Sequence, residues 1–340
     1  MPDKLGVAIA GLDHWYMGLG ELEALQRSQR AQVVALAHRD RAKAEALAQR
    51  YHIPFVTTDY QAVVTREEVE IVLTACPTSE NAALCRAAAA AGKHIVSVKP
   101  IAMTTAEART IREAVRQAGV HFISYESAWR LNPVYRAIQE WVAAGRIGPV
   151  LSALTILRAP LPTQPWPGER GPTWWLDPTR APAGGWLDHA IYHIDFLRWL
   201  LQDEVASVSG VVATLKHRDL AFEDYGVALL TFHRGVQATV EDTWTAPPGG
   251  SLSQVQILGQ EGQIVYDPTL SGKLAVAGRF DLAGWLLTAP PTGPVSVVDH
   301  LATVLQEAVP PVATVDDAVR NLEVGFAFYT AARQGAPVVL

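Results

Sequence analysis

The stretch "AIAGLDHWYMG", residues 8–18, decides the fold of the N-terminal half. It follows a short apolar run and precedes a helical pattern, which is where a dinucleotide-binding fold has its glycine-rich turn. Gly11 stands where the first glycine makes the tight turn, whereas Asp13 and Tyr16 stand where the second and third glycines would be. The sequence therefore predicts a dinucleotide-binding fold with an incomplete phosphate motif.

Two interpretations of this turn are open. Asp13 adds a side chain and a negative charge where phosphates would lie, which favours a fold that has lost dinucleotide binding. In the other interpretation the phosphates take a shifted position, and Leu12, Asp13 and His14 present their backbone N–H groups to them. Both interpretations predict a Rossmann-type domain.

Short apolar strands and longer helical patterns alternate through residues 1–125. The strand-like runs include "KLGVAIAG", "AQVVALAHRD", "EIVLTACP", "KHIVSVKP" and "VHFISYE", and helical patterns such as "RAKAEALAQRYH" lie between them. Strands that are apolar at nearly every position are typical of a parallel sheet covered on both faces, with right-handed crossovers. We therefore expect residues 1–125 to form a doubly wound parallel sheet, an α/β Rossmann domain.

A different pattern begins after this region. Runs such as "VLSALTILRA", "YGVALLTFH" and "VQATVEDTW" are strand-like, and short turns separate several of them, which predicts a large, mostly antiparallel open sheet. Helical patterns over 184–201 and 315–334 complete an expected α+β domain over residues 126–340. Residues 159–183 are rich in Pro, Trp and Gly and indicate a long loop, and loops of this length are often functional.

The composition excludes several classes of protein. The 340 residues are 49% hydrophobic and 18% charged, with a net charge of −6, so we expect neither nucleic acid nor a membrane as a partner. The chain lacks a bilayer-spanning apolar run of ~20 residues, and its N-terminus lacks the pattern of a signal peptide. Cys76 and Cys85 have neither a CxxC nor a metal-like spacing, which favours a reduced, cytoplasmic protein.

The end of the second predicted strand, "ALAHRD" at 35–40, bears on the choice of cofactor. An NAD-specific fold usually carries an acid there for the ribose hydroxyls, but His38 and Arg39 stand at this tip. A guanidinium suits phosphate oxygens, so Arg39, helped by Arg41 or Lys43, can pair with a 2′-phosphate. The sequence therefore favours NADP over NAD, and the alternative is that these are solvated charges at a helix start.

Six stretches spread over almost the whole chain stand in the order that one enzyme family shows. They are "YHIPFVTTDYQAVV", "TACPTSENAALCRAAAAAGKHIVSVKP", "RLNPVYRAIQEWVAAGRIGPV", "GGWLDHAIYHIDFLRWL", "GQEGQIVYD" and "AARQGAPVVL". In these stretches the chain resembles the glucose–fructose oxidoreductase, inositol dehydrogenase and rhizopine-catabolism family (Gfo/Idh/MocA). The resemblance implies hydride transfer between NAD(P) and a sugar, polyol or related alcohol or carbonyl. It also implies a homodimer or homotetramer formed through the open face of the C-terminal sheet.

The resemblance further implies a catalytic lysine. Lys99 in "SVKP" matches the family's shared active-site lysine and lies at the carboxyl end of a predicted parallel strand, where ligands bind in open α/β sheets. Val98 replaces the glutamate that usually precedes it, and Pro100 follows it. A lysine beside a nicotinamide and a substrate hydroxyl can stabilise developing alkoxide charge or help to move a proton.

A second catalytic group lies in "GGWLDHAIYHIDFLRWL", where Asp188, Tyr192 and Asp195 share one helical face. By resemblance, Asp188 binds the substrate, and Tyr192 stands where many members have a proton-transferring histidine and some have tyrosine. We expect Tyr192 to exchange the proton, and a shift of one residue would give this role to His193. His189 and His193 also have a spacing that metals use, but the sequence shows no third ligand and we expect no metal.

Further contacts are implied by the resemblance. The cofactor would also be contacted by residues beyond the turn: His38, Arg39, Thr74, Cys76, Pro77, Asn81, Lys99 and Pro100. Trp129 and Arg130, at the start of the helix that joins the two domains, would lie near the substrate. Trp175 in "GPTWWLDP" would cap a sugar ring, or alternatively pack within its loop.

Three functions fit these observations. The first is an NAD(P)-dependent oxidoreductase for a sugar- or polyol-like alcohol or carbonyl, favoured by Lys99 together with the acid and the phenol of the helix. The second is a non-catalytic relative that binds a sugar or nucleotide as a sensor or scaffold, favoured by Asp13, Tyr16 and Val98. The third is a reductase of imines or cyclic tetrapyrroles, which would have a more apolar pocket.

Overall fold

The computed structural model describes residues 4–280 and 283–340 and divides into two compact units. The first unit comprises Met1–Ala128, Thr163–Pro182 and Pro294–Leu322. The second comprises Trp129–Pro162, Ala183–Gly293 and Glu323–Leu340. This division differs from the single cut expected between residues 125 and 126, because two later segments pack with the first unit.

A six-stranded parallel sheet forms the centre of the first unit, in the order β3-β2-β1-β4-β5-β6. Its strands are β1 Leu5–Ala10, β2 Ala31–Ala37, β3 Phe55–Thr57, β4 Ile71–Thr74, β5 His94–Ser97 and β6 Phe122–Ser124. This is the strand order of a doubly wound dinucleotide-binding sheet, so the predicted Rossmann fold is confirmed. Nearly every residue of β1 and β4 is buried, as expected for strands covered on both faces.

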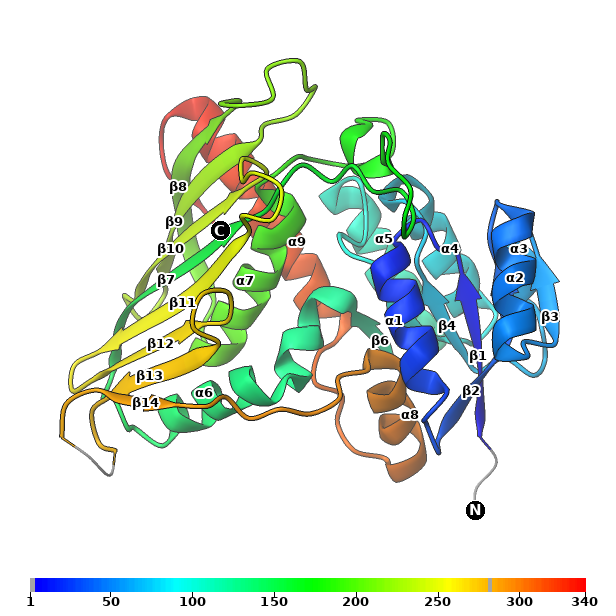
Figure 1. Ribbon diagram of the computed structural model, residues 1–340, viewed down its shortest axis with the longest axis horizontal. Coiled ribbons are helices and arrows are strands. Elements are labelled where there is room, and N and C mark those ends of the chain that lie inside the picture. Colours follow the sequence, from blue (N-terminus) through cyan, green and yellow to red (C-terminus); the bar gives the residue numbers. More distant parts are fainter. Residues whose placement is uncertain (1–3, 281–282) are drawn as a thin grey trace. The chain divides into compact units, whose positions relative to one another are not determined.

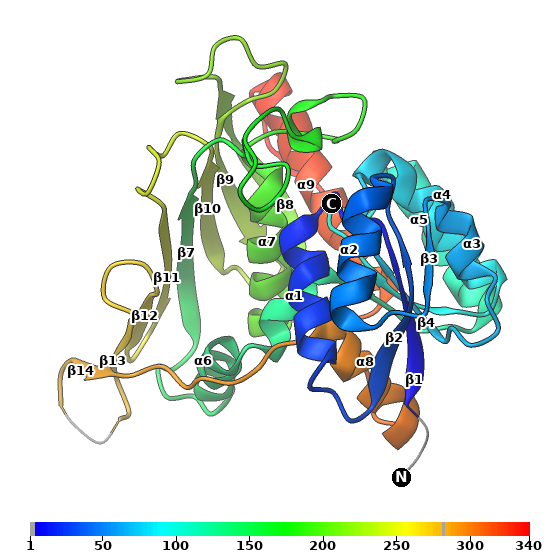
Figure 2. The same cartoon turned by 45° about the vertical axis from the view of Figure 1, so that its right-hand side comes forward.

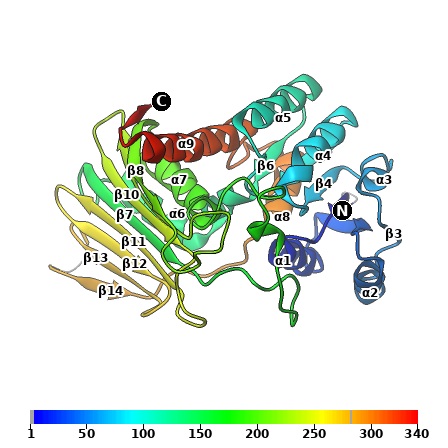
Figure 3. The same cartoon turned by 90° about the horizontal axis from the view of Figure 1, so that it is seen from above.

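Helices cover both faces of this sheet, with α1 and α2 on one face and α4 and α5 on the other (Figure 3). The helices of this unit are α1 Trp15–Leu25, α2 Arg41–Tyr51, α3 Tyr60–Val64, α4 Thr78–Ala90, α5 Thr105–Ala118 and α8 Val297–Glu307. Their ends follow from local sequence. Asp40 and Thr104 accept hydrogen bonds from the first-turn N–H groups of α2 and α5, and Gly119 ends α5 with a positive φ.

A buried carboxylate explains why α8 belongs to the first unit. Glu21 of α1 accepts hydrogen bonds from the Ser296 hydroxyl at 2.6 Å and the Val297 N–H at 2.8 Å, so α1 caps the first turn of α8. Burial raises the pKa of Glu21, and these hydrogen bonds offset the shift only in part.

A nine-stranded sheet forms the centre of the second unit, in the order β14-β13-β12-β11-β7-β10-β9-β8-β15. Its strands are β7 Val150–Arg158, β8 Val205–Ala213, β9 Tyr225–Phe232, β10 Gln237–Thr243, β11 Leu252–Gly259, β12 Gln263–Asp267, β13 Lys273–Ala277, β14 Leu286–Thr288 and β15 Val338–Val339. Neighbouring strands are antiparallel except β7 and β10, which are parallel. The predicted large, mostly antiparallel sheet is therefore confirmed.

Two helices, α6 Pro133–Ala143 and α7 Leu187–Leu201, lie against one face of the nine-stranded sheet (Figures 1 and 3). Ala228 and Leu230 of β9 are buried under the helices, whereas the intervening Leu229 is 44% exposed on the other face. Helix α9 Val315–Gln334 crosses the division between the units, and η1 Tyr125–Leu131 and η2 Trp174–Leu176 are short 3-10 turns. No helix in the described part of the chain combines the length and apolarity needed to span a bilayer.

The expected loop over 159–183 has little regular structure, and its middle packs with the first unit. We call residues Thr163–Pro182 the strap, drawn in green near the N-terminal end of α1 (Figure 2). The Trp15 indole donates to the Gln164 carbonyl at 2.8 Å, and the Trp174 indole donates to the Asp13 carbonyl at 3.1 Å. The strap is therefore fixed to the turn that follows β1.

Candidate functional site

The turn between β1 and α1 requires glycine at its start. Gly11 has a φ of +91°, and a Cβ there would lie 2.7 Å from the backbone nitrogen of Cys76. Gly18, in the first turn of α1, supplies the close packing expected of a third glycine, because a Cβ there would lie 2.8 Å from the buried Leu12 side chain. Tyr16 is 41% exposed, so its bulk is accommodated away from this packing.

The backbone donors of the turn are fewer than expected. The N–H of His14 donates to the Ala75 carbonyl at 2.9 Å, so it is not available to a phosphate, which corrects the expectation for His14. Its buried ring lies 3.0 Å from the Tyr16 hydroxyl. No side chain in the described ranges caps the first turn of α1. The amides of Leu12 and Asp13 remain the predicted phosphate donors.

The Asp13 carboxylate lies between two guanidinium groups and a phenol. Its Oδ1 is 3.4 Å from Arg39 Nε and 3.3 Å from Arg180 Nη2, and its Oδ2 accepts a hydrogen bond from Tyr60 at 3.2 Å. Burial and the Asp13 charge raise the pKa of Tyr60, so the phenol stays protonated. The negative charge that Asp13 adds to the turn is therefore compensated within the first unit.

The tip of β2 is covered by the strap. His38 is buried, and its ring stacks on Trp166 with centroids 6.0 Å apart. Burial lowers the pKa of His38, so its imidazole is neutral at physiological pH. The Lys43 ammonium lies 4.8 Å from the Trp166 ring and 2.8 Å from Glu169. Of the predicted cations at this tip, Lys43 thus has partners in the strap, whereas Arg39 pairs with Asp13 and Glu80, and Arg41 pairs with Glu45.

The ends of β4 and β5 are joined by a buried amide. Asn81 accepts from the Thr74 hydroxyl at 2.6 Å and donates to the Ser97 hydroxyl at 2.9 Å and the Ile101 carbonyl at 2.7 Å. These bonds engage the polar groups of Asn81 and Thr74 within the protein, so cofactor contacts from them remain a prediction. Burial raises the pKa of Cys76 well above its usual value, which suits a thiol and not a thiolate nucleophile. Pro77 precedes the first turn of α4.

Lys99 follows β5 at the carboxyl edge of the same sheet. Its side chain is completely buried, and the Lys99–Pro100 peptide bond is cis. The preceding Val98 is also buried, and its N–H donates to the Thr74 hydroxyl at 3.1 Å. Ligands bind at this edge of an open α/β sheet, so Lys99 stays the predicted catalytic lysine.

Asp188 is held at the start of α7 by an indole. The Trp244 Nε1–H donates to Asp188 Oδ2 at 3.1 Å, and His189 Nδ1 lies 3.5 Å from the same oxygen. The carboxylate is 8% exposed. Trp244 thereby fixes the orientation of the acid predicted to bind substrate.

Tyr192 and His193 differ in their surroundings within the second unit. His193 is completely buried, and its Nδ1 lies 2.9 Å from Oδ2 of the equally buried Asp242 on β10. Burial raises the pKa of Asp242 to about 6, although His193 acts in the opposite direction. Tyr192 is half-buried and lies against the Trp129 ring, with centroids 5.6 Å apart. Of the two candidates, Tyr192 is the one with an accessible surface.

Arg130 has a partner that sequence reasoning did not find. Its guanidinium makes two hydrogen bonds to the Asp195 carboxylate, at 2.8 and 2.7 Å, and the two side chains are 6% and 0% exposed. This pair joins α7 to the segment before α6, which favours a structural role for Arg130; the expected substrate contact stays a prediction. Trp129 stacks on Tyr135 with centroids 4.4 Å apart.

Trp175 is 5% exposed and stacks on Trp174 and Tyr16, with centroids 4.6 and 5.8 Å away. These contacts favour packing within the first unit, which was the alternative to a cap over the substrate. Trp174 and Trp175 therefore attach the strap to the turn after β1.

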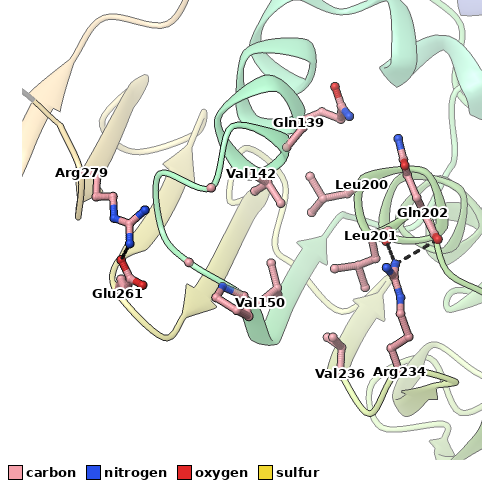
Figure 4. A pocket seen from close by; sticks show the side chains of 14 residues that line it. Gln139, Val142, Val150, Leu200, Leu201, Gln202, Arg234, Val236, Glu261 and Arg279 are labelled. Carbon is pink, nitrogen blue, oxygen red and sulfur yellow. Dashed lines mark hydrogen bonds and ion pairs between the residues drawn. The ribbon is translucent and has the colours of Figure 1, made fainter.

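A cavity of about 670 Å³ opens between the C-terminal ends of α6 and α7 and the strand ends and turns of the large sheet around Val150, Val236 and Glu261 (Figure 4). Arg234 donates to the Leu201 and Gln202 carbonyls, and Arg279 pairs with Glu261. None of the predicted site residues lines this cavity. Because its arginines are engaged by the protein, we assign it no ligand.

Four residues at these sites were missed by sequence reasoning. Asp242 and Trp244 occupy alternate positions of "VQATVEDTW" with the buried Val240, so strand alternation could have shown that they face inward. Tyr60 and Arg180 lie 47 and 167 residues from Asp13 in sequence, and no local pattern predicts that they contact it. Within residues 4–280 and 283–340, no group of three or more His, Cys, Asp or Glu side chains could hold a metal ion.

Comparison with known proteins places both units in one family. Residues 5–126 match the family model described as "Oxidoreductase family, NAD-binding Rossmann fold", and residues 135–265 match that of the "GFO/IDH/MocA C-terminal domain". The scyllo-inositol 2-dehydrogenase (NAD(+)) of Bacillus subtilis (strain 168) is 25% identical over 321 residues, 91% of this chain and 89% of that protein. The 1,5-anhydro-D-fructose reductase of Ensifer adhaerens is 26% identical over 314 residues, 91% of each chain.

Two solved structures share the fold over nearly the whole chain. Aldose-aldose oxidoreductase from Caulobacter crescentus, complexed with glycerol, has a TM-score of 0.85 at 24% identity, covering 99% of this chain and 100% of that one. Levoglucosan dehydrogenase, in complex with NADH and L-sorbose, has a TM-score of 0.86 at 21% identity, covering 99% of both chains.

Proposed function

Because the chain belongs to the Gfo/Idh/MocA family of NAD(P)-dependent oxidoreductases, we propose that it transfers a hydride between a nicotinamide dinucleotide and a sugar- or polyol-like alcohol or carbonyl. The observation that carries this proposal is the carboxyl edge of the first sheet, where the Gly11 turn and the buried Lys99 follow β1 and β5. The names of the relatives, an inositol dehydrogenase and an anhydrofructose reductase, support this substrate class.

The residues of the first unit fit a dinucleotide. The turn has its required glycine, the strand order is that of a dinucleotide-binding sheet, and two guanidinium groups neutralise Asp13. When bound, the nicotinamide supplies or accepts the hydride, and the residues of this chain manage the accompanying proton. Leu12 and Asp13 would donate backbone N–H groups to the phosphates.

We assign the proton chemistry to Lys99, Tyr192 and Asp188. Lys99 stabilises negative charge on the substrate oxygen, Tyr192 donates or accepts the proton, and Asp188, held by Trp244, orients a substrate hydroxyl. His193 is engaged with Asp242 and buried, which favours Tyr192 for contact with substrate.

Turnover of a panel of sugars and polyols with NAD(P) tests these roles. Lys99→Met and Tyr192→Phe should each lower kcat by ~100-fold or more, the usual contribution of general acid–base groups. Lys273→Met in β13 and Tyr51→Phe in α2 make the same two substitutions outside the segments that contain Lys99 and Tyr192, and they should leave kcat unchanged. Near-normal turnover in Lys99→Met would remove this lysine from the mechanism, and failure of the wild type to bind either reduced cofactor would overturn the enzymatic function.

We propose NADP as the preferred cofactor, with Arg39 as its selectivity residue. Arg39 is 47% exposed and pairs with Glu80, itself 39% exposed, at 2.6 Å. Such an exposed pair contributes at most ~1 kcal/mol, so a 2′-phosphate can replace Glu80 as the partner. The ratio of the Kd values for NADH and NADPH, measured by energy transfer from tryptophan, should rise in Glu80→Gln and fall in Arg39→Met. The control Glu45→Gln, which removes the exposed partner of Arg41, should leave this ratio of Kd values unchanged. If the wild type binds NADH more tightly than NADPH, the proposed preference is wrong.

We propose that a second copy of the chain covers the open face of the nine-stranded sheet, forming a homodimer or homotetramer. Val211, Leu229 and Leu258, on three strands, are 60%, 44% and 40% exposed, and strand alternation places them on the face opposite the buried Val208, Leu230 and Ile257. Apolar side chains grouped on one face favour an interface between proteins. Light scattering after gel filtration should give an oligomer for the wild type and smaller species for Leu229→Lys; a monomeric wild type would refute this.

We also propose a cytoplasmic location. Cys76 and Cys85 are both free and buried, and burial raises the pKa of Cys85 to about 12. Such thiols fit a reducing compartment. Fractionation of cells that express the protein tests this, and recovery from an oxidising compartment would contradict it.

A further inference from the structure

A carboxylate lies in the turn where the proposed cofactor would place its diphosphate. The Asp13 side chain is 10% exposed, so water screens its charge only weakly. An uncompensated negative charge at this point would repel the phosphates. The turn can therefore hold an anion only if neighbouring cations neutralise Asp13.

Two arginines supply that neutralisation, and they come from different segments. Arg39 follows β2, and Arg180 comes from the strap; their guanidinium nitrogens lie 3.4 and 3.3 Å from Asp13 Oδ1. Glu80 lies 2.6 Å from Arg39 and 3.9 Å from Arg180, so two positive and two negative groups balance. Loss of either arginine would leave this cluster with a net negative charge.

The strap holds Arg180 in place through its backbone. The Arg180 carbonyl accepts a hydrogen bond from the Ser79 N–H at 3.2 Å, and its own N–H donates to the Asp177 carbonyl at 2.9 Å. The Trp174 indole, from the same strap, donates to the Asp13 carbonyl. The strap thus contacts both the turn after β1 and the first turn of α4, and it brings Arg180 to the Asp13 carboxylate.

We propose that Arg180 completes the dinucleotide diphosphate site by neutralising Asp13, so that the strap offsets the negative charge that stands in place of the second glycine of the turn. This inference rests on the proposed function and adds a positioning residue to it. The ligand class is a dinucleotide diphosphate, whichever base and nicotinamide state it carries. Arg180 acts through Asp13, so its effect depends on the charge at residue 13.

A double-mutant cycle on the full-length protein tests this dependence. The Kd values for NADH, NADPH and ADP-ribose, which keeps the diphosphate without the nicotinamide, are measured by calorimetry or tryptophan fluorescence. Arg180→Gln should raise all three by ~10-fold or more, Asp13→Asn should leave them equal or lower, and the double variant should return to within ~3-fold of the wild type. Arg180→Lys, which keeps the charge, should also stay within ~3-fold. Arg170→Gln changes the same charge at an exposed position of the strap and should have no effect.

Three results would overturn the inference. Arg180→Gln could bind as the wild type does, or the double variant could bind as weakly as Arg180→Gln, which would mean that Arg180 does not act by neutralising Asp13. Circular dichroism of each variant separates loss of binding from loss of fold, and if Arg180→Gln unfolds, Arg180→Met takes its place in the cycle with the same expected result. Absence of all three ligands from the wild type would overturn the proposed function itself, together with this inference.

Discussion

Replacement of Asp195 by asparagine should destabilise the second unit severely. The carboxylate is completely buried and makes two hydrogen bonds of 2.7–2.8 Å with Arg130, whose side chain is 6% exposed. Asp195→Asn keeps the size of the side chain but leaves a buried guanidinium without its counter-charge. Breaking a buried ion pair in this way costs ~3–5 kcal/mol. With ~2–4 °C per kcal/mol for a domain of this size, the melting temperature should fall by ~6–20 °C.

Scanning calorimetry and urea unfolding monitored by circular dichroism measure this loss. Arg158→Met is the matched control, because the Arg158–Glu241 pair has a similar 2.7 Å contact but is 44% exposed on the arginine side, and it should cost less than ~1 kcal/mol. The double variant Arg130→Met, Asp195→Leu should recover most of the loss, because both charges of this pair are removed together. If Asp195→Asn costs no more than Arg158→Met, the buried pair does not hold α7 in place, and a substrate contact for Arg130 regains support.

Three other perturbations follow from the same contacts. Gly11→Ala should destabilise the first unit by ~2 kcal/mol or more, because Gly11 has a φ of +91° and a Cβ there would lie 2.7 Å from a backbone nitrogen. Gly20 lies in α1 with open space around it, so the control Gly20→Ala should stabilise by ~0.5–1 kcal/mol. The urea midpoints of the two variants and the wild type measure both effects. Asp224 accepts hydrogen bonds from three backbone N–H groups, which lower its pKa. The stability that this carboxylate contributes is therefore full above pH ~4 and is lost as the pH falls further. The loss of unfolding free energy in Asp224→Asn should be large at pH 7 and smaller at pH 3, and a loss independent of pH would refute this. Asn81→Leu should cost ~2–4 kcal/mol, because it leaves the Thr74 and Ser97 hydroxyls and the Ile101 carbonyl without this partner in the core; a stable variant by thermal melting would contradict the network.

Much of the fold could be predicted because the signals were local. Apolar strands separated by helical patterns predicted the parallel sheet of the first unit, and alternating strands with short turns predicted the antiparallel sheet of the second. The helical pattern over 184–201 corresponds to α7 Leu187–Leu201. The position of Thr163–Pro182 was not predictable, because its attachment depends on single contacts such as Trp174 with Asp13, which no periodicity encodes.

The sequence by itself determined the family, the two kinds of sheet and the chemical identities of Lys99, Asp188 and Tyr192, because motifs and periodicities are properties of neighbouring residues. Only the tertiary structure decided which charges meet. It placed Arg180 against Asp13, Asp195 against Arg130 and Asp242 against His193, across separations of 49 to 167 residues. Charge compensation depends on distance in space, and the folded chain alone sets that distance.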